Sequence, residues 1–225
     1  MHQRTRNLSS TNKLRFDETG QANGYGSPYR GRMRHDVTLS RGDITLRPLT
    51  IDDAPRLLAM VDVQSWSGMG RPLPEDDAAM ATHLQCQVDD PNMVPFAVEL
   101  AGRMVGRTNF YDLVPNVRVD IGHTIYDRQV WGSHVNPTAK LLLLSYAFDE
   151  LAVARVGLRC DHRNRRSHRA IAYLGATFEG TLRRFRPTAD GTIADVDYFS
   201  VTQDDWPAVR AWLESRLSRT ATTAP

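Results

Sequence analysis

A strand, a polar turn, an apolar helix and a second strand follow one another between residues 117 and 161, and this order constrains the fold more than any other feature. "VRVDIGHTIY" (Val117–Tyr126) alternates like a strand, "TAKLLLLSYAF" is typical of a buried helix, and "ARVGLRCD" has the pattern of the next strand. A helix that connects two strands of one sheet makes them parallel. A second helix, "NRRSHRAIAYLG", follows, so two helices are expected to begin at the same sheet edge.

Further strands and helices are predicted on both sides of this central unit. A strand at Asp43–Leu49 precedes two helices, one beginning in "TIDDAPRLLAMV" and one near Asp76–Val88. Turns at "AGR" and "PTADG" separate two pairs of predicted hairpin strands, and a last helix lies in "DDWPAVRAWLESRLSR". Hairpin strands combined with crossover helices predict an α/β fold with a mixed central sheet flanked by helices.

The ends of the chain differ in composition from the middle. Residues 1–36 are rich in Arg, Asn, Ser and Gly and show neither a helical nor a strand period, so we expect a disordered or weakly ordered extension. Met33 is an alternative natural start. One domain is expected over residues 37–219, with a frayed tail at 220–225.

Composition narrows the class of protein. The net charge of the 225 residues is only +2, which argues against a dedicated nucleic-acid binder. No apolar run has the length that a membrane span needs, so no membrane contact is expected. Cys86 and Cys160 have neither disulfide-framework nor metal-site spacing, and they predict reduced thiols, a cytoplasmic location and no metal.

The polar turn (residues 128–134) has the features of an anion site. Asn136 is a good N-cap and Pro137 suits the first helical position, so the helix would present free N–H groups to the turn. These groups, with the helix dipole, attract phosphate. Gly132 allows close backbone approach and Arg128 adds positive charge. The alternative is an ordinary strand–turn–helix, which has the same free N–H groups.

The second strand–helix unit adds a basic stretch, "RCDHRNRRSHRAIAYLG". A solvated basic face is the alternative interpretation. Because the two helices are expected to begin side by side, the stretch favours a polyphosphate ligand shared by both helix N-termini.

From about Asp43 to Arg219 the chain resembles the GNAT N-acetyltransferase superfamily, most closely the branch of ribosomal-protein N-terminal acetyltransferases. The resemblance is carried by "VDIGHTIY", "RQVWGSHVNPTAKLLLLSYAFDEL", "RVGLRCDHRNRRSHRAIAYLGATFEGTLR" and "DVDYFSVTQDDWP". It implies acetyl-CoA as donor, with its diphosphate on residues 129–134 and the helix that follows. The implied cofactor-binding residues are Arg128, Gln129, Trp131, Gly132, Ser133, His134, Val135, Asn136, Asn164 and Ser167.

One position departs from the family pattern. His134 stands where the family loop has a small residue, so its side chain is expected to point either away from the phosphates or toward them as an additional donor. Backbone N–H contacts do not depend on the side chain, so a loop with His134 is compatible with CoA binding. Whether His134 preserves the loop is left open by the sequence, and an exposed loop residue without a role is the alternative.

The implied mechanism needs a base that removes a proton from the acceptor amine. Asp120 lies where the family often has an acidic residue, with Glu99 and His123 as reserves. A structural polar residue is the alternative for Asp120. Counting by two along the strand places Asp120 and His123 on opposite faces.

The mechanism also needs an oxyanion donor and an acid for the CoA thiolate. The resemblance implies a backbone N–H within residues 124–126 as donor. Ile171 occupies the position of the tyrosine that many relatives use as acid, and Tyr173 is expected on another face of its helix. Ser167 matches the serine of the ribosomal-type branch, and we expect it or a water to be the acid.

We therefore expect an N-acetyltransferase in which a primary amine attacks acetyl-CoA directly. The alternatives are a non-catalytic acyl-CoA sensor on the same fold and, against the near-neutral charge, a nucleic-acid binder. The sequence is compatible with a protein N-terminus or a small molecule as the amine acceptor. It is also compatible with a monomer or a homodimer. Trp66 and Met69 are expected near the acceptor, as a lid or as local core, together with Trp131, Phe185 and Tyr198.

Overall fold

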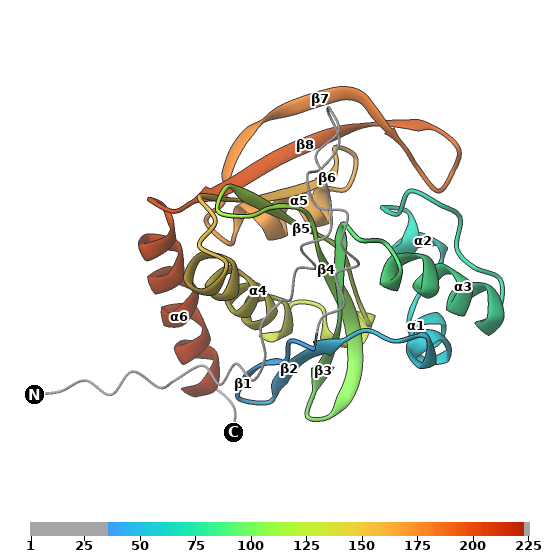
Figure 1. Cartoon of the computed structure of the whole chain (residues 1–225), viewed down its shortest axis with the longest axis horizontal. Coiled ribbons are helices and arrows are strands. Elements are labelled where there is room, and N and C mark those ends of the chain that lie inside the picture. The colour runs from blue at the N-terminus through green and yellow to red at the C-terminus, as the bar shows by residue number, and fades with distance from the viewer. Residues whose placement is uncertain (1–35, 223–225) are drawn as a thin grey trace, which may run out of the picture.

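One mixed sheet of eight strands forms the centre of the part that the computed structural model describes, residues 36–222 (Figure 1). Its spatial order is β1-β2-β3-β4-β5-β6-β8-β7. The strands are β1 (Leu39–Arg41), β2 (Ile44–Pro48), β3 (Met93–Leu100), β4 (Arg103–Val114), β5 (Arg118–Tyr126), β6 (Arg155–Asp161), β7 (Thr177–Pro187) and β8 (Ile193–Thr202).

Helices cover both faces of this sheet. Figure 1 shows α1, α2 and α3 on one side and α4 and α6 on the other. Their bounds are α1 (Ala54–Met60), α2 (Val63–Trp66), α3 (Asp77–Val88), α4 (Val135–Ser145), α5 (Arg165–Ala172) and α6 (Trp206–Thr222). Short 3₁₀ turns precede α1 and α4 at Ile51–Asp53 and Arg128–Val130, and α4 continues as a π-helical turn, Tyr146–Glu150. The predicted α/β fold is confirmed.

The predicted parallel pair is β5 and β6, and all other neighbouring strands are antiparallel. Helix α4 connects the two parallel strands and α5 follows the second, so both helices begin beyond the carboxyl ends of adjacent strands. Their buried residues, such as Leu143 and Ile171, share one apolar core with Ile121 and Leu158 of the sheet.

The sheet opens between β5 and β6. Their pairing runs from Arg118–Arg155 to Ile121–Leu158 and stops there. Directly after this point β5 carries a bulge, where its register with β4 shifts and His123 has a φ of 51°. A bulge bends its strand, so β5 turns away from β6. The gap leaves room for a ligand between two strands of one sheet.

Two short elements and one helix boundary differ from the sequence prediction. Strand β1 and helix α2 were too short to give a period. Helix α4 begins at Val135, with His134 as N-cap, so the prediction that Asn136 is the N-cap was wrong. Val135 is fully buried. Pro137 is at the third helical position, where a backbone N–H would have no partner within the helix, so its missing N–H costs no hydrogen bond. Asn164 caps α5 as predicted, accepting a hydrogen bond from the Ser167 N–H.

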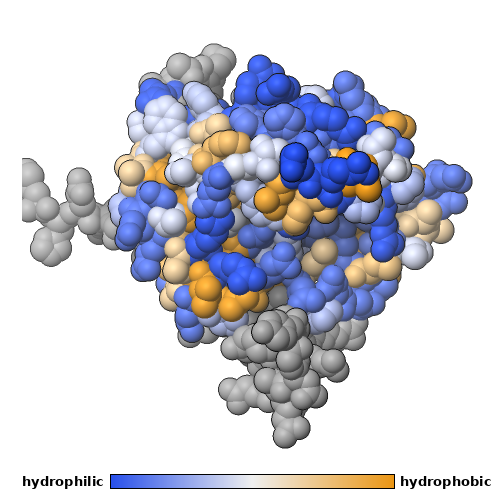
Figure 2. All heavy atoms as spheres, turned by 90° about the horizontal axis from the view of Figure 1, so that it is seen from above, coloured by the Kyte–Doolittle hydropathy of each residue, from blue (hydrophilic) through white to orange (hydrophobic). Residues whose placement is uncertain are grey.

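The expectations for residues 1–35 and 223–225 lie outside the described residues, and α6 continues to Thr222, beyond the predicted domain end. No helix within residues 36–222 is both long and apolar enough to cross a membrane. Figure 2 views the molecule from above, the side of β7 and β8, and shows a mainly hydrophilic face interrupted by separate apolar patches.

Candidate active site

A cavity of about 400 Å³ lies where β5 and β6 diverge. Residues 121–126 of β5 and 158–161 of β6 form two of its walls. Helix α5 contributes a third wall, and the start of α4 and residues 68–70 complete the lining. Within the described residues the pairing of β5 with β6 stops at Ile121, so those backbone N–H and C=O groups beyond it that have no other partner are available to a ligand in the cavity.

The turn end of the cavity (Trp131, Gly132 and Asn136) carries part of the predicted phosphate site. Gly132 has a φ of +76° and no atom within 4 Å of where a Cβ would lie, so the backbone is open to a ligand. The Trp131 indole N–H donates to the Tyr126 carbonyl at 3.0 Å, which fixes the ring at the end of β5.

Arg166 is a cation at this end that the sequence did not single out. Its guanidinium lies 3.6 Å from the centre of the Trp131 ring and lines the cavity. This stacking joins the first turn of α5 to the polar turn before α4. The signal was present in the basic stretch 159–169, but the sequence could not say which arginine faces the ligand.

Five of the predicted cofactor-binding residues do not line the cavity. Arg128 is exposed and pairs with Asp62 at 2.6 Å, and Val135 is buried in the core. The remaining three are Gln129, Ser133 and His134. Asn164 and Ser167, by contrast, line the cavity.

His134 points away from the cavity. Its Nε2 lies 3.0 Å from a carboxylate oxygen of Asp43, in the turn between β1 and β2. Of the two orientations expected for this side chain, the structure has the one that leaves the backbone of the polar turn unobstructed.

Asp120 lies beside the cavity and not in its lining. Its side chain is 9% exposed and packs against Gly157, where a Cβ would come within 2.2 Å of the carboxylate. Burial raises the pKa of Asp120, and the charge of Arg159 opposes that rise. A carboxylate with a raised pKa is a stronger proton acceptor than an exposed one.

His123 lines the cavity and packs on Tyr111, the cross-strand partner of Asp120, so it points to the same face of the sheet as Asp120 and the expectation of opposite faces was wrong. Its ring lies edge-on to Tyr111, 5.5 Å between centres. The bulge at His123 breaks the period of two. Burial lowers the pKa of His123 to about 3, aided by the charges of Arg107 and Arg159, so the ring is neutral at neutral pH.

Glu99, the other reserve base, is occupied elsewhere. It accepts a hydrogen bond from Arg47 at 2.7 Å and does not line the cavity. The geometry leaves Asp120 and His123 as the candidates for proton removal.

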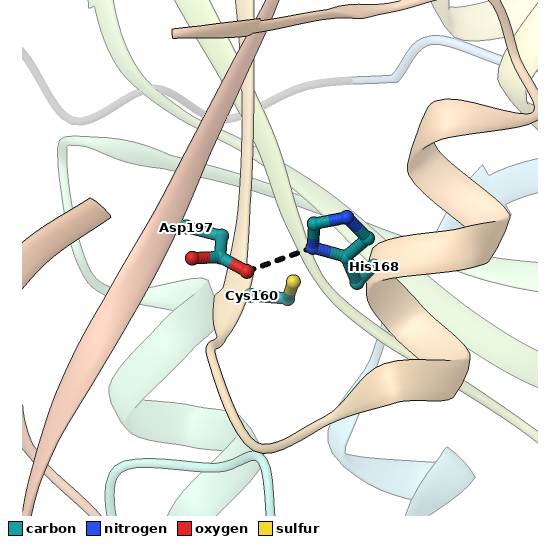
Figure 3. A group of neighbouring side chains, drawn as sticks. All are labelled: Cys160, His168 and Asp197. Atoms are coloured by element: carbon teal, nitrogen blue, oxygen red, sulfur yellow. Dashed lines mark hydrogen bonds and ion pairs between the residues drawn. The ribbon is translucent and has the colours of Figure 1, made fainter. Parts of the chain in front are cut away.

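Ser167 lines the cavity next to a cluster of hydrogen-bonded side chains centred on Asp197. Figure 3 shows three of its members, Cys160, His168 and Asp197. In that cluster the His168 and His162 Nδ1 atoms lie 2.7 and 2.8 Å from the two oxygens of Asp197. Burial opposes ionisation of Asp197, but hydrogen bonds from Thr181 and both histidines keep its pKa below the ordinary value. The cluster ties α5 to β6 and β8 and thereby fixes the helix that carries Ser167.

Cys160 belongs to the same group. Its thiol and the ligand atoms of His168 and Asp197 lie within 4.8 Å of one another, and a direct His168–Asp197 hydrogen bond joins two of the three. Burial raises the pKa of Cys160 to about 11, while a hydrogen bond with Ser167 acts in the opposite direction. The thiol is therefore protonated and does not act as a nucleophile at neutral pH.

The two residues expected near the acceptor as a lid or as local core, Trp66 and Met69, lie in different environments. Trp66 is 1% exposed and donates its indole N–H to the Arg71 carbonyl, so it is local core. Met69 lines the cavity. Tyr173 is exposed and packs on Trp212, away from the cavity, as expected.

Lys140 is a cavity residue that the sequence analysis missed because it lies in the apolar stretch of α4. Its Nζ donates to the hydroxyls of Thr124 at 2.8 Å and Thr108 at 3.3 Å. Burial lowers the pKa of Lys140 to about 7. The lysine holds Thr124, which directly follows the bulge.

Comparison with known proteins decides the family. A model described as an acetyltransferase (GNAT) domain matches residues 43–177. The chain belongs to the GNAT acetyltransferase family. A crystal structure described as an acetyltransferase from T. thermophilus is 34% identical, with a TM-score of 0.76, covering 80% of this chain and 96% of that chain. No curated protein matches.

Two further solved structures share the fold of this GNAT domain. A GCN5-related N-acetyltransferase from Brucella melitensis is 24% identical, with a TM-score of 0.75, over 81% of this chain and 86% of that one. Mycobacterium smegmatis RimJ, solved with CoA-disulfide, is 20% identical, with a TM-score of 0.66, over 77% and 88%. Family membership supports an acyltransferase that uses acetyl-CoA, and the predicted resemblance is confirmed.

Proposed function

We propose that this GNAT domain transfers the acetyl group of acetyl-CoA to a primary amine by direct attack. The observation that carries the proposal is the cavity between β5 and β6, which runs from the start of α4 to the bulge at His123. A ligand with a diphosphate at one end and a reactive thioester at the other matches this shape.

The turn end is proposed to bind the CoA diphosphate. At the start of α4 the Asn136 N–H is the donor left without a helical partner, because the Val135 N–H donates to the Ser133 hydroxyl and Pro137 has no N–H. The backbone around Gly132 is open to the ligand, and Arg166 on Trp131 adds a positive charge. The pantetheine arm is proposed to lie along the free edge of β5 and beside Asn164, since extended amide chains bind strand edges through backbone hydrogen bonds. Arg128, Gln129, Ser133, His134 and Val135 would shape this end without touching the arm.

The chemistry is proposed to involve one bond formed and one bond broken. The amine nitrogen attacks the thioester carbonyl carbon, and the carbon–sulfur bond then breaks. Asp120 would take the amine proton through a water, because it lies behind the cavity wall, while neutral His123 accepts a hydrogen bond from the amine. A backbone N–H within residues 124–126 would stabilise the oxyanion. Ser167 would return a proton to the thiolate.

A non-catalytic acyl-CoA sensor remains the second candidate. This candidate is favoured by the position of Asp120, which does not line the cavity. Asp120 can act as the base only if a water connects it to the amine.

Turnover separates the two candidates. The full chain is incubated with acetyl-CoA and a panel of primary amines, CoA release is followed with a thiol reagent, and products are identified by mass spectrometry. An acetyltransferase releases CoA in proportion to acetylated amine. Tight acetyl-CoA binding with no acetylated product from any amine, peptide N-termini included, would favour the sensor.

A further inference from the structure

The end of the cavity opposite the polar turn is positively charged, and binding of acetyl-CoA does not require this charge. Arg159 and Arg186 line it. Arg159 directly follows Leu158, the last residue of β6 that pairs with β5, so it lies where the two strands part. We name Arg159, Arg186 and the overlying residues 68–70 the arginine end of the cavity. The CoA diphosphate is proposed to bind at the turn end instead.

Arg159 is held rigidly. Its guanidinium donates to the Tyr198 hydroxyl at 2.5 Å and lies 4.8 Å from the centre of the Tyr111 ring. The Phe185 ring lies 5.9 Å away on β7. Aromatic faces fix a guanidinium without neutralising its charge. A rigid arginine that keeps its charge is suited to bind an anion.

The carboxylates near the arginine end do not balance it. Within residues 36–222, neither Arg159 nor Arg186 has a carboxylate oxygen within the 4 Å of an ion pair. Asp161 lines the cavity and its charge acts on Arg186 at longer range, but its direct partner is Arg163, which holds both of its oxygens at 2.8 and 3.0 Å. Asp120 acts on Arg159 only at longer range, and burial raises the pKa of Asp120.

Arg107 adds a third positive charge behind the cavity wall. It is fully buried, and its partners are Gln87, His83 and the Met69 sulfur, with no carboxylate among them. Burial lowers the pKa of Arg107 to about 10, so it stays protonated at neutral pH.

These charges restrict the acceptor. A primary amine is an ammonium ion in neutral solution, and three arginines repel it. An anionic group on the same molecule reverses the sign of this interaction, and the arginines then favour the neutral form of the amine, which is the form that attacks.

Residues 68–70 restrict its size. The Arg186 Nη2 donates to the Gly68 carbonyl at 2.9 Å, and Gly68 lies against the Asn164 amide, 3.5 Å from where its Cβ would be. This segment therefore connects β7 with the start of α5 over the arginine end, and such a cover favours a small molecule over the N-terminus of a folded protein.

We propose that the acceptor is a small primary amine that also carries an anionic group, a carboxylate or a phosphate, bound by Arg159 and Arg186. The proposal rests on the proposed acetyltransferase function. It excludes polyamines and other purely cationic amines as preferred acceptors.

Matched pairs of acceptors test it. Initial rates are measured at saturating acetyl-CoA for the common amino acids against their amides, and for phosphoethanolamine against ethanolamine. We expect kcat/KM at least about tenfold higher for the anionic member of the preferred pair. Whether the carboxylate or the phosphate pair shows the larger ratio identifies the anion. Equal or faster acetylation of the neutral members would overturn the proposal and leave the acetyltransferase function intact.

Substitutions separate binding of the anion from a structural role. Arg159→Gln and Arg186→Gln should each collapse the anionic-to-neutral ratio toward one, with little change in the KM for acetyl-CoA. Arg183→Gln, an exposed arginine on the same strand as Arg186, should leave the ratio unchanged. A structural defect lowers both rates and keeps the ratio, and a ratio that survives in both variants contradicts the proposal.

Anion binding can also be measured without turnover, which tests the proposal even when the true acceptor is not among the amines assayed. With CoA bound, the turn end is filled, and the arginine Nε–H NMR signals are followed while acetate or inorganic phosphate is added. Shifts in signals that disappear in Arg159→Gln and Arg186→Gln support the site. Unmoved signals overturn it. Failure of CoA itself to bind would instead overturn the proposed function.

Discussion

The two ends of the cavity both carry positive charge, but they are built in different ways. At the turn end the charged groups are near solvent: Arg166 is exposed on a ring, Trp131, that is itself 37% exposed. At the arginine end, Arg159 and Arg186 are half-buried and Arg107 is fully buried. The first end relies mainly on backbone N–H groups, and the second on side chains.

This difference determines how each end responds to change. Exposed charges are weakened by salt, whereas buried charges keep most of their effect. Backbone donors are lost only when the loop conformation is lost, whereas a buried arginine is lost with one substitution. Changes of loop shape should therefore affect acetyl-CoA, and changes of buried charge should affect the acceptor.

The largest effect is expected from the loop conformation. Gly132→Val places a side chain at a φ of +76° beside the proposed diphosphate. We expect the acetyl-CoA Kd to rise at least about tenfold, about 1.4 kcal/mol, by calorimetry. Gly102→Val is the matched control, since Gly102 has a φ of +77° and open space in the β3–β4 turn. Both variants should lose similar stability, and equal Kd values would remove the polar turn from the site.

Ser167→Ala tests the proposed acid between the two ends. We expect kcat to fall about tenfold, less than the roughly 10²–10⁴-fold that one proton-transferring group contributes, because a water can take the place of the hydroxyl; the acetyl-CoA Kd should be nearly unchanged. The measurement is steady-state turnover together with calorimetric binding. Normal turnover in this variant would assign the proton of the thiolate to a water or another residue.

Lys140 gives a smaller, pH-dependent effect on stability. Its pKa is about 7 in the folded protein and 10.5 ordinarily, so the unfolded chain binds more protons in between and stability rises with pH there. Compared with Lys140→Met, the wild type should gain about 1 kcal/mol, or about 2–4 °C in Tm, as pH rises from 7 to 8. A constant Tm difference would mean that Lys140 keeps an ordinary pKa.

Changes in ionic strength should give the smallest effect on the kinetic constants. They test directly whether the turn end is more exposed to solvent than the arginine end. Raising salt from low to physiological concentration should raise the KM for acetyl-CoA a few-fold, since the turn end is exposed. The preference for an anionic over a neutral acceptor should change less. Steady-state kinetics in a chloride series measure both, and an equal loss at both ends would mean that the arginine end is as open to solvent as the turn end.

The sequence predicted the order of the large elements, because long apolar periods define them. Gly132, Asn164 and Ser167, which it singled out for cofactor binding, line the cavity. The sequence misplaced the start of α4, because the buried contact of Val135 outweighs the capping preference of Asn136. It also put His123 on the wrong face, because a bulge has no sequence signature in a period-two count.

The arginine end could not be predicted from the chain. Arg107 and Arg186 lie on separate strands and meet around His123 only in the folded sheet, as their influence on its pKa indicates. Lys140 was hidden in an apolar helix. Buried charged side chains of this kind can be recognised only when their burial and their lack of counter-charges are known. The spacing of residues along a strand contains neither piece of information.

Thermal unfolding of the full chain with acetyl-CoA tests the central claim, that the cavity between β5 and β6 binds this cofactor. At a ligand concentration of about 100 times Kd, binding should add roughly 2.7 kcal/mol, which for a chain of this size is about 5–10 °C in Tm. The account predicts this shift with acetyl-CoA and with CoA, and little shift with ATP. An unchanged Tm with both CoA species would contradict it.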